Sequence, residues 1–517
     1  MPIHSNLPVT LIQRIIRNTA TRKQLLIVVV WVFAILLVAN SISPVQALSF
    51  RPLRDKRTTT TMTIVVGLNP ALQKRFVLSQ TKNPTLVKGS VHRAETVEEG
   101  IGGKGQDVAV SLSKLWPSNN NSSFPRPLCL AQFVSNDSNG DRVLSLLRNV
   151  LGDETENSKD RDTAAAAAAW ETLTVRTKSP MRTCTSIVGV DATTELVEPS
   201  GFVQEQEWKS LLEKLENHAT IESAAAAAGA LVFMGSMPPG CPEEMYAKIL
   251  SSLVGKSQQS MLLLIDSVVG LKPLIRTLEE TKKRKSKSLG NCILKINASE
   301  LCRLAGVVST NLGEAEGTSQ EDLQMAIARF LIEYKVGGSS LNYLAITDGK
   351  HPAHLVKIGV QNEKQQQTPT IIQRMYTLGI NDLANAFESA KDNDCVLYPI
   401  GAGDTVAAGT ISSLLYLQDY VEDDGSSSSV SLSTNSPLED HCSKALLSFR
   451  NNIMERCSNN ENDDANMLAA FCFGLACGSA SCLERENSVF STKTAIRLLE
   501  QMPLPEEIIK TKDNSES

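Results

Sequence analysis

The chain has 517 residues, of which 42% are hydrophobic and 21% are charged, and its formal net charge is −5. These proportions are ordinary for a soluble globular protein, and the slightly negative charge gives no electrostatic reason to expect a nucleic-acid partner. The 11 cysteines are scattered and include no Cys-x-x-Cys pair. We therefore expect neither a disulfide framework nor a zinc site, and a reducing compartment suits the chain better.

Residues 1–47 form a basic and apolar leader. Four basic side chains precede an apolar run over residues 25–39, and no acidic residue comes before this run. The run is shorter than the about 20 residues that cross a bilayer as a helix. Val45-Gln46-Ala47 has the small residues of a cleavage site. We expect a signal peptide over residues 1–47, with an uncleaved membrane anchor over residues 25–42 as the alternative.

Residues 48–61 are basic and rich in threonine, like a transit peptide. A signal peptide followed by such a segment, with Phe50 near the junction, resembles the two-part plastid address of algae with complex plastids. The expected location is therefore an organelle, a plastid, whose interior would also suit free cysteines. A membrane contact is expected only through the N-terminal segment, if that segment stays uncleaved.

Short apolar runs that end in turn residues recur along the rest of the chain. They cover residues 64–68, 231–234, 261–265, 292–296 and 344–346, and stretches with helical spacing, such as residues 108–115, lie between them. Buried strands that alternate with helices indicate a mostly parallel sheet covered on both faces. Ligands bind such sheets beyond the carboxyl ends of the strands. Most of the polar motifs of this chain fall at those ends.

Polar or compositionally biased stretches interrupt this pattern at about residues 117–127, 152–170, 281–290, 361–395 and 419–464. We interpret them as surface insertions, which are tolerated because loop-closure entropy grows slowly with loop length. The remainder is predicted as one domain over residues 62–500, followed by a polar tail over residues 501–517. The basic residues 282–287 within one insertion could bind an anionic partner, or could simply be solvated.

The stretch Gly401-Ala402-Gly403-Asp404-Thr405 precedes a run with helical composition. Two glycines allow a sharp turn, and the first amides of the helix lack helical partners, so that they favour a phosphate. Asp404 is then well placed to accept a proton from an attacking hydroxyl. Such an arrangement fits phosphoryl transfer to an alcohol, although a glycine turn with Asp404 as a helix cap would read the same way.

Three motifs in order give a family resemblance. Gly102-Gly103-Lys104-Gly105, Asn297-Ala298-Ser299-Glu300 and Gly401-Ala402-Gly403-Asp404 resemble signatures of the PfkB family of carbohydrate kinases. Residues 68–72 and 235–240 are similar to those of its 1-phosphofructokinase and tagatose-6-phosphate kinase branch. The resemblance implies a ribokinase-like three-layer α/β/α fold with a mostly parallel central sheet. It also implies a small β lid, formed near residues 76–78 and 186–190.

The resemblance also assigns roles on the nucleotide side. Asp404 would be the catalytic base, and the backbone of Gly401, Ala402 and Gly403 would form an anion hole. Asn297 and Glu300 would hold Mg²⁺ through water, with a helix capping box as the structural alternative. Thr347, Asp348 and Gly349 stand where the family binds its nucleotide, ATP, although any β-turn would look the same.

On the sugar side, Gly102, Gly103 and Gly105 would approach the substrate, and Lys104 and Arg182 would hold a phosphate that it carries. Two positions depart from the family: Gln73 replaces an Asp, and Asp107 replaces an Asn. We expect Asp107 to accept hydrogen bonds from the sugar hydroxyls, with Gln73 beside it.

The resemblance therefore implies an ATP-dependent kinase that acts on a sugar phosphate, and it suggests a homodimer. A kinase for a free sugar or a nucleoside is one alternative. A non-catalytic PfkB-like protein with a structural or regulatory role in an organelle is the other.

Overall fold

The structure is a computed structural model, and all of its described residues belong to one compact unit within residues 59–517. It describes residues 62–78, 86–116, 128–151, 173–189, 193–222, 228–254, 260–284, 289–308, 317–336, 341–359, 372–380, 383, 397–419, 438–456 and 462–510. The predicted leader, transit-like segment and insertions 117–127 and 152–170 lie outside these residues and stay predictions. No helix within the described ranges is both long and apolar enough to cross a membrane.

The largest element is a sheet of ten strands. Neighbouring strands of this sheet are parallel along the part that runs from β11 to β5. The three pairs along the part from β11 to β14 are antiparallel. The buried strands expected from the sequence are confirmed as β1, β8, β9, β10 and β11. From edge to edge the sheet runs β14 (Glu506–Lys510), β13 (Ile372–Leu378), β12 (His351–Ile358), β11 (Tyr343–Asp348), β10 (Leu289–Asn297), β9 (Met261–Asp266), β8 (Ala228–Met234), β1 (Met62–Val66), β4 (Leu128–Ser135) and β5 (Thr174–Thr177).

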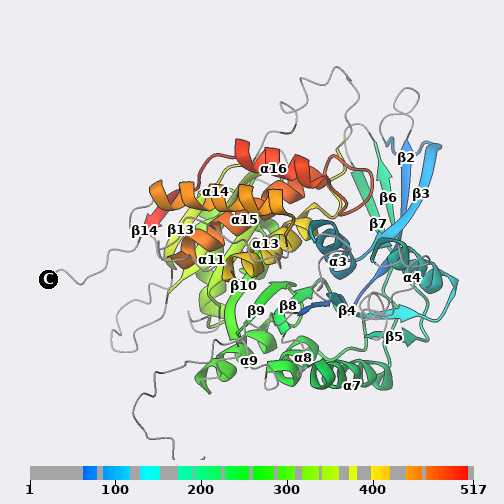
Figure 1. The fold of residues 1–517 in the computed structure, drawn as a ribbon. Coiled ribbons are helices and arrows are strands. Elements are labelled where there is room, and N and C mark those ends of the chain that lie inside the picture. The colour runs from blue at the N-terminus through cyan, green and yellow to red at the C-terminus, as the bar shows by residue number, and fades with distance from the viewer. Residues whose placement is uncertain are drawn as a thin grey trace, which may run out of the picture. The chain divides into compact units, whose positions relative to one another are not determined.

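Helices cover both faces of this sheet, which gives the predicted α/β/α layering (Figure 1). Successive strand residues point to opposite faces, so Val65 joins one hydrophobic core while Ile64 and Val66 join the other. The first core is covered by α3 (Lys104–Leu115), α4 (Ser138–Leu151), α13 (Ala402–Asp419), α14 (Asp440–Arg456), α15 (Asn462–Ser481) and α16 (Thr492–Gln501). The second is covered by α7 (Glu205–Glu222), α8 (Met245–Val254), α9 (Leu271–Lys283), α10 (Ala298–Leu304) and α11 (Gln320–Glu333).

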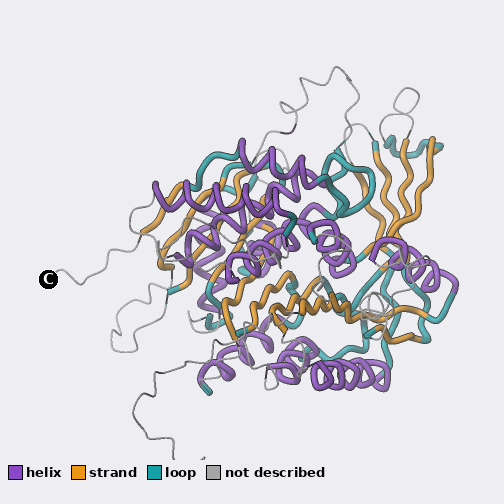
Figure 2. Tube along the Cα trace, viewed as in Figure 1, coloured by secondary structure: helices purple, strands orange, loops and turns teal. Residues whose placement is uncertain are grey.

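A second, four-stranded sheet stands beside the first and is the predicted lid (Figure 2). Its order is β3 (Ala94–Gly102), β2 (Ala71–Leu78), β6 (Thr183–Val188) and β7 (Thr193–Val197). The chain leaves the main sheet after β1 and enters the lid as β2. After β3 it leaves the lid and continues directly into α3. The lid is therefore attached at the carboxyl end of β1, where a ligand site was expected.

The structure corrects several predicted boundaries. β13 lies inside the stretch interpreted as insertion 361–395, and α14 lies inside insertion 419–464. α9 reaches into insertion 281–290 and β10 starts within it, while β14 lies in the predicted polar tail. α14 was missed because only one of its faces is buried and biased sequence flanks it. These segments belong to the folded domain.

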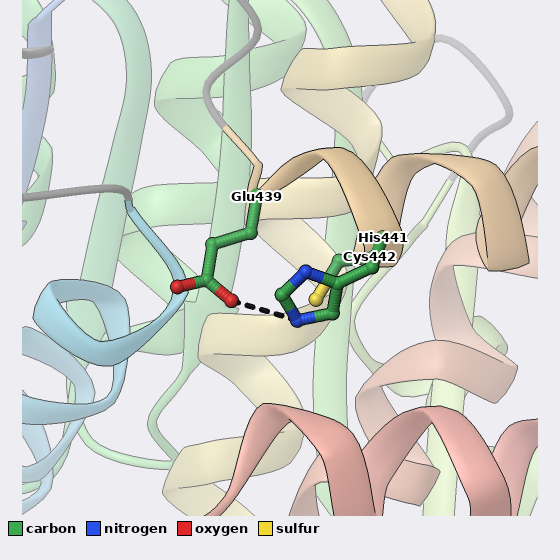
Figure 3. A group of neighbouring side chains, drawn as sticks. All are labelled: Glu439, His441 and Cys442. Carbon is green, nitrogen blue, oxygen red and sulfur yellow. Dashed lines mark ion pairs between the residues drawn. The ribbon is translucent and has the colours of Figure 1, made fainter. Parts of the chain in front are cut away.

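Polar contacts join the start of α14 to α16, and Figure 3 shows the residues on the α14 side. The carboxylate of Glu439 accepts a hydrogen bond from Thr492 Oγ1 at 3.1 Å and lies 2.9 Å from His441 Nε2. Cys442 lies within reach of the same group and is buried, and this burial raises the pKa of its thiol to about 12. We interpret this group as a helix-to-helix contact, because the carboxylate already has partners on both helices.

A buried carboxylate joins α15 to the antiparallel side of the main sheet. Asp464 Oδ1 accepts from the Tyr343 hydroxyl at 2.8 Å and lies 2.9 Å from Lys357 Nζ. Its Oδ2 lies 3.1 Å from Arg374 Nη1. The carboxylate is only 1% exposed, so its charge depends on these two cations. This cluster connects β11, β12, β13 and α15.

Replacing Asp464 with Ala should strongly destabilise the fold. Removing one partner of a buried ion pair leaves an uncompensated charge, which costs about 3–5 kcal/mol. Asp463→Ala is the matched control, since Asp463 is exposed in the same helical turn and should change the free energy of unfolding little. Urea denaturation of the two variants measures the difference. Equal midpoints would show that the cluster does not stabilise the fold.

Candidate active site

A cavity of about 560 Å³ opens between the lid and the carboxyl ends of the main-sheet strands. Its walls come from the end of β1, from β2 and β7 of the lid, from the start of α3 and from the turn before α13. The predicted site residues that line it are Gln73, Gly103, Lys104, Gly105, Asp107, Arg182, Glu300, Gly401 and Asp404. Residues far apart in the sequence therefore meet at the sheet edge where the sequence placed a ligand site.

The glycine turn before α13 has the expected geometry. Gly401 has a φ of +82°, and a Cβ on it would lie 2.5 Å from Ser488 Oγ, so glycine is required on both counts. The amides of Ala402 and Thr405 donate to carbonyls within the turn. The amides of Gly403 and Asp404 are then the ones left without helical partners, at the positive end of an 18-residue helix.

Asp404 is buried at the start of α13, and only 8% of it is exposed. Burial raises the pKa of Asp404 to about 7, while Lys104 and Lys295 act in the opposite direction and Asp266 and Glu300 add to the rise. A carboxyl group with a pKa near neutrality can hold and release a proton at physiological pH. This is the property of a general base.

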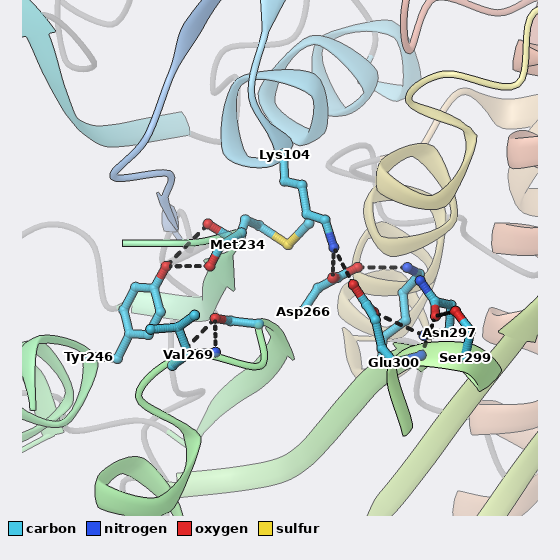
Figure 4. Close-up of polar contacts among 11 residues, drawn as sticks. Lys104, Met234, Tyr246, Asp266, Val269, Asn297, Ser299 and Glu300 are labelled. Carbon is cyan, nitrogen blue, oxygen red and sulfur yellow. Dashed lines mark hydrogen bonds and ion pairs between the residues drawn. The ribbon is translucent and has the colours of Figure 1, made fainter. Parts of the chain in front are cut away.

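Two lysines converge on one buried carboxylate beside this turn, and Figure 4 labels Lys104 and the carboxylate, Asp266. Lys104 Nζ lies 2.7 Å from Asp266 Oδ1, and Lys295 Nζ lies 2.6 Å from Asp266 Oδ2. Burial alone would raise the pKa of Asp266, but Lys295 and Lys104 outweigh it and hold that pKa below its usual value. Lys295 Nζ also lies 3.4 Å from where a Cβ on Gly403 would stand. Both cations thus lie close to the start of α13.

The Asn297–Glu300 motif forms the capping box that was its structural alternative. Asn297 Oδ1 accepts from the Glu300 amide at 2.7 Å and from Ser299 Oγ at 2.8 Å, and Glu300 Oε2 accepts from the Asn297 amide at 3.3 Å. Glu300 Oε1 takes no part in the cap and faces Lys104 Nζ at 3.8 Å. This oxygen and Asp266 offer the hard oxygen donors that suit Mg²⁺. The metal role of Asn297 stays a prediction.

The part of the cavity next to the lid is also acidic. Asp107, on α3, is 5% exposed, and its Oδ1 has no hydrogen-bond partner in the part of the chain that the structure describes. Burial, Asp404 and Glu195 raise the pKa of Asp107 well above its usual value. Gln73, on β2, is also buried, and its amide donates to Ser186 Oγ. A buried carboxyl oxygen that lacks a partner is a place where a ligand hydroxyl could bind.

Arg182 lines the cavity but is partly committed to the backbone. Its Nη2 donates to the carbonyl of Asn69 at 2.7 Å, and its Nε donates to the carbonyl of Pro70 at 3.2 Å. These bonds fix the connection between β1 and β2. A guanidinium has five donor hydrogens, so this anchoring and a contact with an anionic ligand are compatible.

Gly105 has a packing role that its predicted function did not include. A Cβ on Gly105 would lie 2.3 Å from the Cα of Gly67, at the end of β1. Glycine is therefore required for α3 to start this close to the strand. Gly103 lines the cavity as the residue before α3, whereas Gly102 is the last residue of β3 and does not line it.

Thr347, Asp348 and Gly349 do not line the cavity. Thr347 and Asp348 are the last two residues of β11 and Gly349 follows them; Thr347 is in register with Asn297 of β10. The Asp348 carboxylate accepts from the Thr318 amide at 2.8 Å. These three residues share the functional edge of the sheet, and their nucleotide role stays a prediction.

Sequence reasoning missed Asp266, Lys295 and Glu195 as site residues. Asp266 ends a predicted strand, and the rule that ligands bind beyond strand ends could have found it. Lys295 is a charge inside an apolar strand, which is rare unless the charge is paired. Glu195 is mostly exposed on β7 of the lid, where charged side chains are usually just solvated.

Comparison with known proteins identifies the fold. No family model matches the chain. Ribokinase from Giardia lamblia aligns with 86% of this chain and 99% of its own, with a TM-score of 0.50 and 13% identity. This likeness confirms the predicted ribokinase-like fold. Escherichia coli phosphofructokinase-2, solved with potassium, aligns with 86% of this chain and 99% of its own (TM-score 0.48, 16% identity). A possible 1-phosphofructokinase from Thermotoga maritima aligns with 87% of this chain and 100% of its own (TM-score 0.47, 14% identity).

The raised pKa of Asp404 should make stability depend on pH. The folded chain binds this proton more tightly than the unfolded chain, whose Asp pKa is about 3.9. The free energy of unfolding should therefore fall as pH rises from about 4 to about 7 and then level off. Asp404→Asn removes this contribution, so the variant should gain about 1–4 kcal/mol on the wild type between pH 4 and pH 8. Denaturant titrations at both pH values measure the gain. A difference that does not change with pH would contradict the assignment.

Proposed function

We propose that this protein is an ATP-dependent kinase that phosphorylates an alcohol group of a sugar or sugar phosphate. The observation that carries the proposal is Asp404: a buried carboxyl group with a pKa near 7, at the amino-terminal end of α13 and on the wall of a cavity. The ribokinase-like fold agrees with a kinase, but a fold does not define a function, so the proposal depends on the residues of the site.

Asp404 would take the proton from the hydroxyl that attacks. A base works best when its pKa lies near the working pH, and burial together with the neighbouring carboxylates supplies that pKa here. The carboxyl lies in the first turn of α13, beside the open amides of its own turn. A hydroxyl that reaches Asp404 therefore also reaches the positive end of the helix.

The phosphate side would be bound by positive groups that are already in place. Lys104 and Lys295 are held by Asp266, and Lys295 lies next to Gly403. Such preorganised charges stabilise a moving phosphoryl group without reorganisation during the reaction. ATP would supply the phosphoryl group, and Mg²⁺, held by Asp266 and Glu300, would neutralise phosphate charge.

The choice between a sugar phosphate and a free sugar rests on Arg182. In this assignment Lys104 serves the transferred phosphoryl group, so a phosphate on the substrate would rely on Arg182. The acidic pair of Asp107 and Glu195 favours a hydroxyl-rich group at that end. A free sugar is therefore the second candidate substrate. The homodimer implied by the family resemblance stays a prediction, which the particle mass in solution would test.

An ADP-release assay over free sugars, sugar phosphates and nucleosides tests the proposal. At least one sugar or sugar phosphate should be turned over, and Asp404→Asn should lower kcat by about 10²–10⁴-fold. Asp463→Asn, at an exposed position of α15 outside the cavity, is the matched control and should retain most of kcat. Equal turnover by Asp404→Asn and the wild type would refute the mechanism. A wild type inactive on the whole panel would refute the proposed class.

Asp107→Asn tests the sugar end of the cavity. The change restores the residue usual in the family and removes the acceptor that lacks a partner. We expect a several-fold or larger change in KM together with a changed order of substrates, because mismatched polar groups cost about 1–3 kcal/mol. The same panel, run on the variant, measures this. An unchanged KM and an unchanged order of substrates would show that Asp107 does not contact the sugar.

A further inference from the structure

Three soft donor atoms meet at a point remote from the cavity. Cys129 Sγ lies 3.0 Å from His218 Nε2 and 3.1 Å from Met62 Sδ, and His218 Nε2 lies 3.2 Å from Met62 Sδ. The atoms form a nearly equilateral triangle. They come from three separate elements: Met62 from β1, Cys129 from β4 and His218 from α7. No local sequence pattern joins them, so the fold alone creates the group.

The triangle lies at the amino-terminal ends of strands β1 and β4, whereas the cavity lies beyond the carboxyl ends of the strands. Met62 is the first residue of β1, and Cys129 is the second residue of β4. The cavity is at the other, carboxyl end of these strands. Met62 and Cys129 are 2% and 0% exposed, while His218 is half-buried. The imidazole therefore gives the buried sulfur atoms a route to solvent.

Hydrogen bonding cannot account for all three contacts. The thiol carries one hydrogen, and the imidazole Nε2 carries at most one, so at most two of the three contacts can hold a hydrogen. The two sulfur atoms also lie closer than the roughly 3.5–4.0 Å at which smaller carbon atoms pack. One cation between the three atoms would use a lone pair from each.

The distances suit a small metal ion. A point equidistant from the three atoms lies about 1.8 Å from each, so a slight outward movement gives the about 2.0–2.3 Å typical of metal–nitrogen and metal–sulfur bonds. A thioether with a thiolate selects copper(I) over harder ions. We propose that Met62, Cys129 and His218 form a binding site for a monovalent soft metal ion, copper(I).

The charge balance also selects a monovalent ion. When copper(I) binds, a Cu–S bond forms, the S–H bond of Cys129 breaks, and the proton leaves to solvent; no electron is transferred. One thiolate with one monovalent cation gives a neutral site. A divalent ion would leave a net positive charge among apolar neighbours such as Leu211 and Leu215, which is costly without a further anion.

Competition with the chromogenic copper(I) chelator bicinchoninate, under anaerobic conditions and on the full chain, tests the proposal. The wild type should hold one more copper(I) per chain than Cys129→Ser. Met62→Leu and His218→Gln should weaken this binding at least tenfold. Cys241→Ser, which removes a half-buried thiol elsewhere, should bind like the wild type. X-ray absorption should find two sulfur atoms and one nitrogen around the metal.

Copper retention that is equal in the wild type and Cys129→Ser would overturn the site, because other thiols would then explain the binding. A first shell without nitrogen would do the same. Met62→Leu conserves volume, so it keeps the test valid if Cys129→Ser does not fold. Copper(I) should raise the melting temperature of the wild type, and zinc should raise it less; an equal rise with zinc would refute the preference for a monovalent ion.

Discussion

The candidate active site depends on one buried carboxylate, Asp266. It ends β9 and binds an ammonium group on each side, one from α3 and one from β10. An uncompensated carboxylate at this depth would be costly, and so would Lys295, which is 5% exposed. Each charged group therefore offsets the free-energy cost of burying the others. The ion triad fixes the start of α3 against the ends of two strands, so that structural charge pairing and site geometry arise from the same contacts.

The same triad sets the proton affinity of Asp404. Burial would favour the neutral acid, and the carboxylates of Asp266 and Glu300 push in the same direction. Lys104 and Lys295 oppose them, and a pKa near 7 results. Burial would lower the pKa of Lys104, but Asp266, Asp404 and Glu300 outweigh it, so its pKa lies above the ordinary value. The base is tuned by a balance of charges rather than by one neighbour.

The fold class and the location of the site followed from the sequence because both depend on local patterns. Apolar runs ending in turns predicted the parallel strands, and glycine-rich spacing marked the turns before α3 and α13. The rest depends on contacts between distant residues. Asp266 ends a strand and Lys295 is a charge inside an apolar strand, but only the fold shows that the two groups lie 2.6 Å apart. β13 and α14 were missed because biased sequence surrounds them, so that the pattern of buried residues in each is short and interrupted.

The carboxyl ends and the amino ends of the strands in the main sheet carry chemically opposite groups. The difference follows from the elements that meet at each end. At the carboxyl edge, strand ends meet helix starts, whose dipoles favour anions, and hard oxygen donors gather there with lysines. At the amino edge, Met62 and Cys129 enter the sheet beside the carboxy-terminal half of α7, where a dipole no longer attracts an anion. Neutral, polarisable sulfur is tolerated at such a buried position where carboxylates are not. A ligand bound at the amino ends of the strands must therefore leave the site with little net charge. Exchange of the Cys129 thiol proton for one monovalent cation meets this condition, because the charge of the site does not change.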